Sequence, residues 1–75
     1  MISLSIELLE EEKVDIRIYD FSGKYLKTLY NEKCSKGISV LDFDVSELST
    51  GTYFVSINNF NLSSSEVKKL IILKQ

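Results

Sequence analysis

Hydrophobic and polar residues alternate with a period of two along most of this chain. The first segment, 2–8, has isoleucine or leucine at every even position and polar residues between them. The clearest segment, 14–19, places valine or isoleucine at even positions and Asp15, Arg17 and Tyr19 at odd ones. Alternation of this kind predicts β-strands that bury one face and expose the other.

The stretch between these two segments, 7–13, allows two interpretations. Two leucines followed by glutamates are compatible with a helical turn. A polar hairpin connection is favoured, because no residue caps a helix and the apolar spacing fits no more than one turn. On that interpretation the run Glu10–Glu12 is a solvated charge run.

Glycines mark two of the expected chain reversals in the first half. Asp20–Gly23 reads as a tight hairpin turn in which Gly23 supplies a positive φ angle, and Gly37 closes the polar stretch 31–37. Between them a third strand is predicted at 24–30. Leu26 and Leu29 lie three residues apart there, so a β-bulge, or a strand ending near Thr28, is needed to bring both to one core.

The second half of the chain predicts three further strands. Leu41, Phe43 and Val45 share one face of a fourth strand, and a turn at 46–51 follows, with Gly51 expected where the chain reverses. A fifth strand is predicted at 52–57, a polar loop at 58–66 and a last strand at 67–73. Four successive apolar residues, 70–73, suggest that both faces of the last strand are covered or that it docks onto a neighbour.

This pattern gives six to seven short strands, with turn signals at intervals of about 10–12 residues, and no long helical segment. The fold class is therefore predicted to be all-β, a small Ig-like antiparallel β-sandwich. The 75 residues form one domain, 1–75, near the lower size limit for an unaided hydrophobic core. A hydrophobic content of 44% with 27% charged residues is that of a globular chain.

Candidate catalytic chemistry is sparse. The sequence has no histidine and one cysteine, Cys34, so there is neither a disulfide nor a histidine to activate the thiol. Cys34 is expected to be a semi-buried or exposed thiol. No phosphate-binding, nucleophile-elbow or zinc motif occurs. We therefore expect no enzyme activity, no cofactor and no metal.

Three groups of polar or aromatic residues have an ordinary and a functional interpretation. Asp42 and Asp44 have a spacing that can seat calcium, but a solvated sheet face is favoured, because no third acidic ligand with glycine spacing follows. Asp15 and Arg17 are interpreted as a surface ion pair of small energetic value. An exposed aromatic face that binds sugars or proteins can be built from three tyrosines, although small sandwiches commonly carry such residues. These are Tyr19, Tyr25 and Tyr30.

The C-terminal strand is basic, with Lys68, Lys69 and Lys74 set against Glu66 alone. The ordinary interpretation is that these lysines protect an edge strand from aggregation. The functional interpretation is that a receptor binds this basic, apolar tail by β-strand addition.

Charge and hydropathy argue against two kinds of partner. The net charge of −2 gives no reason to expect nucleic acid, and no apolar run approaches the length of about 20 residues that spans a membrane. The first residues lack the basic and apolar regions of a signal peptide. Met1 is interpreted as a domain boundary, with any export signal of a parent protein outside this chain.

Three segments together resemble a known family. They are 14–24 (VDIRIYDFSGK), 48–57 (LSTGTYFVSI) and 68–74 (KKLIILK). In order and spacing they are similar to the type A C-terminal sorting domain of the type IX (Por) secretion system of Bacteroidetes. The similarity extends from about Ile2 to Lys74. Three departures do not exclude the assignment. Phe21-Ser22 intervenes before the glycine of the first motif, which is a mild change. Ser49 stands where the family commonly has proline, so the turn is less rigid, and Gln75 extends past the last lysine.

The resemblance implies a sorting and secretion signal, joined to an N-terminal cargo domain. Such domains pass through the periplasm, engage the outer-membrane translocon and sorting machinery, and deliver the cargo to the cell surface or release it. The matching positions imply a set of sorting-signal recognition residues. They are Gly23, Gly51, Tyr53, Phe54, Val55, Lys68, Lys69 and Lys74.

A second function class stays open from the sequence: a structural Ig-like spacer or adhesion module, including the flagellar hook-capping Ig-like type. That relative usually carries a Trp-Asp-Gly step, and this chain has no tryptophan. The sorting domain is therefore favoured. Its exposed edge strands further predict that the isolated domain can form a homodimer, for which exchange of the terminal strand is one route.

Overall fold

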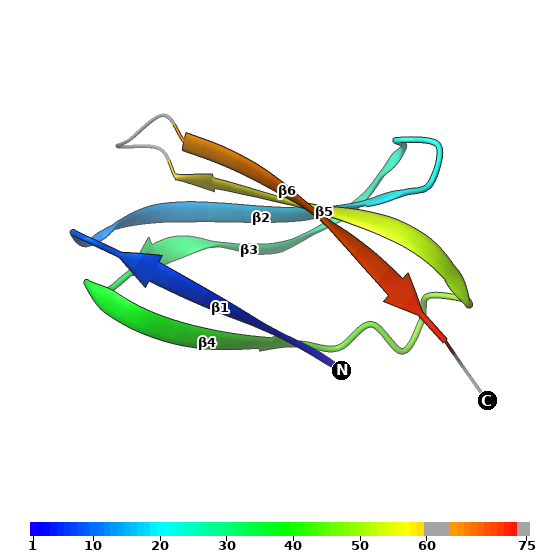
Figure 1. The fold of residues 1–75 in the computed structure, drawn as a ribbon, viewed down its shortest axis with the longest axis horizontal. Coiled ribbons are helices and arrows are strands. Elements are labelled where there is room, and N and C mark those ends of the chain that lie inside the picture. The colour runs from blue at the N-terminus through cyan, green and yellow to red at the C-terminus, as the bar shows by residue number, and fades with distance from the viewer. Residues whose placement is uncertain (60–63, 74–75) are drawn as a thin grey trace.

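The computed structural model describes residues 1–59 and 64–73, and for Ser64 the backbone only. Within these residues the chain forms six β-strands and no helix (Figure 1). The strands are β1 Ile2–Leu8, β2 Glu12–Asp20, β3 Tyr25–Cys34, β4 Gly37–Phe43, β5 Gly51–Asn59 and β6 Ser64–Ile72.

The strands form two antiparallel sheets that face each other. One has two strands in the order β1-β4, and the other has four in the order β3-β2-β5-β6. In Figure 1 β1 and β4 lie below β3, and β6 runs from the upper left to the lower right, crossing β5 in this view. The prediction of a small all-β, Ig-like sandwich is confirmed.

The core lies between the two sheets. Val14, Ile16 and Ile18 of β2 are each fully buried, as their alternation predicts. Burying a side chain of this size stabilises the fold by about 1.5–3 kcal/mol. The other buried hydrophobic residues come from each of the other five strands and from the segment after β4. They are Ile6, Leu8, Cys34, Phe43, Val45, Tyr53, Val55, Ile57 and Ile72.

The connection between β1 and β2 is not a hairpin. β1 pairs with β4 over its whole length, from Ile2 opposite Phe43 to Leu8 opposite Gly37, so residues 9–11 cross from one sheet to the other. Because β2 begins at Glu12, this side chain turns towards the core and is only 3% exposed. The expectation of a solvated run therefore holds for Glu10 and Glu11 but is wrong for Glu12.

Strand β3 contains the predicted irregularity. Its pairing with β2 shifts between Ile16 and Arg17 and again between Ile18 and Tyr19, which leaves Leu29 and Leu26 of β3 without a directly opposite residue. Leu29 packs against the core, whereas Leu26 is 36% exposed, so only one of the two leucines joins it. β3 also continues to Cys34, beyond the predicted end at residue 30.

The turns and strand limits of the second half differ from expectation in detail. Gly23 and Gly37 have φ angles of 92° and 106°, as a reversal requires, but Gly51 has no positive φ and begins β5. Val45 lies beyond the end of β4 and is still buried. β5 extends two residues further than predicted, to Asn59, and β6 begins at Ser64, within the predicted loop. The rest of that loop, 60–63, lies outside the described residues.

Strand β6 is exposed on both faces from 65 to 69, and only its last residues alternate between exposed and buried side chains. Ile71 and Leu73 are 59% and 81% exposed, whereas Ile72 is buried at 9% and Leu70 is half-buried. The interpretation that both faces of 70–73 are covered is wrong for this chain by itself, because β6 is an edge strand with only one face against the core. No helix among the described residues is long and apolar enough to span a membrane.

Candidate functional site

The turn between β2 and β3 is built around the carboxylate of Asp20. Oδ1 of Asp20 accepts hydrogen bonds from the backbone N–H of Ser22 and of Lys24, both at 2.9 Å, and from the Ser22 hydroxyl at 2.7 Å. The Ser22 hydroxyl and the two N–H groups lower the pKa of this carboxyl group. Gly23, whose N–H donates to the Asp20 carbonyl at 3.0 Å, completes the turn with its positive φ.

In the segment 48–57, a tyrosine near the start of β5 is anchored to the loop before the strand. The hydroxyl of Tyr53 donates a hydrogen bond to the carbonyl of Ser49 at 2.7 Å, and the Tyr53 ring is 7% exposed. A Cβ atom at Gly51 would meet that ring at 3.8 Å, an ordinary contact distance. Val55 is 1% exposed. Tyr53 and Val55 are therefore core residues, inaccessible to a partner while the domain is folded.

Phe54 projects from the face of β5 opposite to that of Tyr53 and Val55. This is the outer face of the four-stranded sheet. Tyr19 of β2 lies directly opposite it on one side and Lys69 of β6 on the other, and Tyr25 of β3 lies opposite Tyr19. These four residues form one line across all four strands, which we call the aromatic row.

Ring contacts hold the aromatic row in place. The rings of Tyr19 and Tyr25 meet edge to face with centroids 6.0 Å apart, and Phe21, from the β2–β3 turn, stacks on Phe54 at 6.4 Å. Phe21 is 73% exposed and Tyr25 50%. Sequence reasoning treated Phe21 only as a turn residue. Two signals were available in the sequence. Phe21 lies two residues after Tyr19, and Tyr19 and Phe54 each have the opposite parity to the core residues of their own strands.

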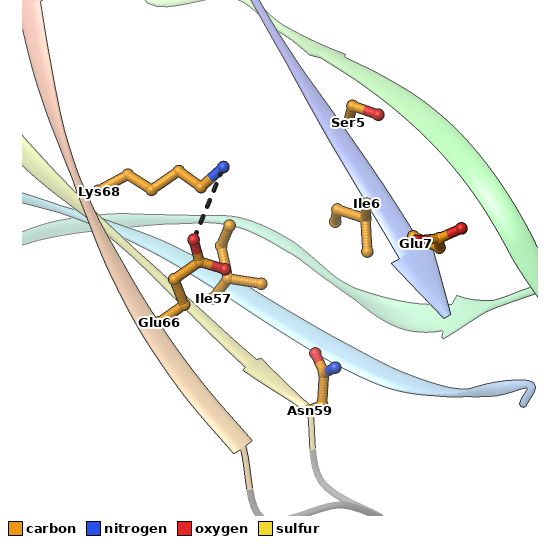
Figure 2. A pocket seen from close by; sticks show the side chains of 7 residues that line it. All are labelled: Ser5, Ile6, Glu7, Ile57, Asn59, Glu66 and Lys68. Atoms are coloured by element: carbon orange, nitrogen blue, oxygen red, sulfur yellow. Dashed lines mark ion pairs between the residues drawn. The ribbon is translucent and has the colours of Figure 1, made fainter. Parts of the chain in front are cut away.

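Lys68 and Lys69 lie on opposite faces of β6. Lys69 is at the end of the aromatic row, whereas Lys68 lies opposite Val55 and turns to the inner side, where its Nζ is 3.7 Å from Oε1 of Glu66. There it lines an open slot of about 110 Å³ between β6 and β1, with Ile57 at its floor (Figure 2). The structure thus separates the two lysines, and Lys74 lies outside the described residues.

Tyr30 does not belong to an exposed tyrosine face. It lies opposite the core residue Ile16, its ring meets that of Phe43 edge to face at 6.5 Å, and its hydroxyl is 3.4 Å from Cys34 Sγ. The Cys34 contact and burial raise the pKa of Tyr30 to about 12. Cys34 itself is 3% exposed, so the expectation of a semi-buried or exposed thiol is wrong.

The three aspartates singled out in the sequence are engaged within the fold; they are Asp15, Asp42 and Asp44. Asp15 pairs with Arg17 (Oδ2 to Nε, 2.7 Å), as expected. Arg17 is 45% exposed, but Asp15 is only 2% exposed, so the expectation of a surface pair is wrong for the acid. Asn31 also donates to Asp15, at 3.3 Å. Asp42 accepts a hydrogen bond from Ser3. Asp44 accepts one from the N–H of Ser46 at 2.9 Å, which lowers the pKa of Asp44. The described residues contain no group of three metal-ligating side chains.

Comparison with protein families identifies the chain. The family model described as "Secretion system C-terminal sorting domain" matches residues 1–73. Searches of curated proteins and of solved structures give no match. The family match does not favour a structural spacer or a hook-capping module. Because it covers nearly the whole chain, this protein belongs to the secretion system C-terminal sorting domain family and is a C-terminal sorting signal for the type IX secretion system.

Proposed function

We propose that the secretion machinery recognises this domain in its folded state, through the outer face of the four-stranded sheet around Phe54 and Lys69. The observation that carries the proposal is the aromatic row, which brings these two residues of the sorting motif side by side on one accessible face. Aromatic side chains with an adjacent cation are enriched at the centres of protein interfaces.

The motif residues then divide into two groups with different tasks. Gly23, Tyr53 and Val55 build the scaffold: the first supplies a turn, and the other two are buried beneath the strand that carries Phe54. Phe54 and Lys69 make the contact, with Phe21 and Tyr25 enlarging it. Gly51 has no positive φ, and its Cβ position is free of close contacts. A requirement for glycine there would therefore come from a partner that approaches the backbone.

The exposed side chains of β6 support this choice of face. Val67 and Ile71 are 63% and 59% exposed, and both share the outer face with Lys69, since they lie opposite Ser56 and Thr52 of β5. Exposed apolar side chains that gather on one face of a small domain are typical of a site of interaction. Lys68, on the inner side, is excluded from the contact.

The route of the cargo follows from the family. The domain is joined to an N-terminal cargo, passes through the periplasm with it and meets the outer-membrane translocon and sorting machinery, which deliver the cargo to the surface or release it. Lys74 contributes to the basic end of the signal. The sorting-signal family supports a non-catalytic role, and no cofactor is assigned.

A matched pair of charge reversals on β6 tests the proposal. A reporter protein is fused ahead of residues 1–75 in a cell with an active type IX system, and its surface-exposed fraction is measured. Lys69→Glu is expected to reduce surface delivery about tenfold, the effect of losing an interface residue worth more than 1 kcal/mol. Lys68→Glu is expected to leave delivery nearly unchanged. Equal loss from both variants, or loss from Lys68→Glu alone, contradicts the proposal.

Removal of the last strand tests the sorting function as a whole. Deleting Val67–Gln75 from the same fusion removes most of β6 and one end of the aromatic row. The reporter is then expected to stay in the periplasm, as shown by cell fractionation and resistance to added protease. Surface delivery of the truncated fusion would argue against a signal that uses this strand.

A further inference from the structure

Strand β6 offers an unpaired edge to the outside of the domain. Among the described residues it is the last strand of the four-stranded sheet, and it is bonded to β5 alone. The backbone groups on its other side are a template for a further strand. On the outer face this edge exposes Val67 and Ile71, and on the inner face Glu66 and Lys68.

The sequence of β6 is self-complementary around Val67. When a strand pairs antiparallel with a copy of itself about a two-fold axis at Val67, Glu66 of each copy lies opposite Lys68 of the other. This forms two opposite-charge cross-strand pairs on the inner face, and each such pair stabilises a sheet. Val67 meets Val67 of the second copy on the outer face.

We propose that two copies of this chain pair edge to edge through β6, with the two-fold axis at Val67. The two four-stranded sheets then form one continuous sheet of eight strands. The contact is isologous, as in most homodimers. It is independent of the sorting function, because it uses the edge and the inner charges of β6 rather than the aromatic row.

The competing register, centred on Lys69, is less favourable. It pairs Val67 with Ile71 twice, which brings apolar residues together. It also sets Lys69 directly opposite Lys69 of the second copy, and like charges in that position destabilise a sheet. Glu66 then faces Ile72, so both charge pairs are lost. The charges therefore select the register centred on Val67.

The inner side of β6 has room for the second copy. The slot between β6 and β1 is open beside Glu66 and Lys68, as Figure 2 shows. The intrachain pair there is long, at 3.7 Å, and its side chains are 62% and 47% exposed, so both can turn towards a second copy.

Charge reversal with restoration tests this dimer. Sedimentation velocity of the 75-residue domain over a concentration series gives the dissociation constant. Glu66→Lys and Lys68→Glu alone each place like charges opposite one another twice and are expected to weaken association about tenfold. The double variant restores both pairs and is expected to return the constant to near the wild-type value. Circular dichroism of each variant confirms that it is folded.

Disulfide trapping tests the register. Val67→Cys places two thiols opposite each other across the axis, and mild oxidation is expected to join them. Ile71→Cys is the matched control, with similar exposure on the same face. Its two thiols are eight positions apart along the paired strands, about 27 Å, and are expected not to react. Cys34 is buried and present in both variants.

Three results would overturn the proposal. One is a monomer at every concentration tested. Another is a dimer whose dissociation constant is unaffected by Glu66→Lys and Lys68→Glu, as expected if β6 is exchanged between copies and keeps its native register with β5. The third is trapping through Ile71→Cys in preference to Val67→Cys.

Discussion

The hydroxyl of Tyr53 donates a hydrogen bond to the backbone carbonyl of Ser49, over 2.7 Å. This bond joins the start of β5 to the loop that precedes it and holds the ring in the core. It gives the run LSTGTYF a physical explanation: Leu48 packs against the core, the tyrosine anchors the loop, and Phe54 is thereby directed to the outer face. The scaffold and the contact surface are built by neighbouring residues.

Loss of this bond is expected to weaken the fold measurably. Tyr53→Phe keeps the buried ring but leaves the Ser49 carbonyl without that donor, so the free energy of unfolding should fall by about 1 kcal/mol. Urea denaturation measures it. Tyr25→Phe is the control, since its hydroxyl bonds to Thr28 at the exposed surface. A larger loss for Tyr25→Phe than for Tyr53→Phe would contradict the anchoring role.

The two glycines of the sorting motif are expected to respond differently to alanine. Gly23 has a φ of 92°, where an L side chain is strained, so Gly23→Ala should lower the free energy of unfolding by about 1–2 kcal/mol. Gly51→Ala meets no close contact and should change it by less than about 0.5 kcal/mol. Thermal denaturation compares them. Equal destabilisation would show that Gly51 has a structural constraint that its backbone does not reveal.

Acid is expected to destabilise the domain through the β2–β3 turn. The pKa of Asp20 is lowered in the folded state, so its contribution is present above the unfolded value of about 3.9 and is lost as pH falls through the lower, folded value. Asp20→Asn removes this titration and should flatten the dependence of stability on pH below about 4. Glu10→Gln removes the same charge at an exposed position. An equally flattened curve for Glu10→Gln would contradict a specific role for Asp20.

The ion pair of the buried acid Asp15 is expected to matter more than one in which both partners are exposed. Arg17→Met leaves the carboxylate of Asp15, which is 2% exposed, with the hydrogen bond from Asn31 but without its cation, and should lower the free energy of unfolding by about 1–2 kcal/mol. Lys27→Met breaks the more exposed Lys27–Glu47 pair and should cost less than about 1 kcal/mol. Chemical denaturation of both variants measures the difference. The reverse order would contradict the assignment of Asp15 as a buried acid.

The strands that alternate strictly were predictable, because burial of one face is a local property of the sequence. Val14, Ile16 and Ile18 show this, and the bulge in β3 followed from the spacing of its leucines. The pairing of β1 with β4 is non-local and leaves no trace in either segment. The sequence therefore predicted a hairpin where the chain crosses between the sheets, and it predicted a solvated side chain for Glu12.

The candidate site was predictable in its members but not in its arrangement. Residues an odd number of positions apart on a strand lie on opposite faces, which separates Lys68 from Lys69. The same rule separates Tyr25 from Tyr30, because the two bulges between them together preserve the parity. Burial of Asp15 and Cys34 depends on neighbours from other strands. The aromatic row depends on the register of four strands, which the sequence of any one does not specify.

The most decisive measurement is a crosslinking test of direct contact between the outer face and the secretion machinery. A photo-reactive amino acid is placed at Lys69 or, as the matched control, at Lys68 in a cargo fusion during export, and crosslinked partners are identified by mass spectrometry. Crosslinks to a component of the secretion system are expected from position 69 and not from position 68. Crosslinks from position 68 alone, or equally from both, would contradict recognition through the outer face of the folded domain.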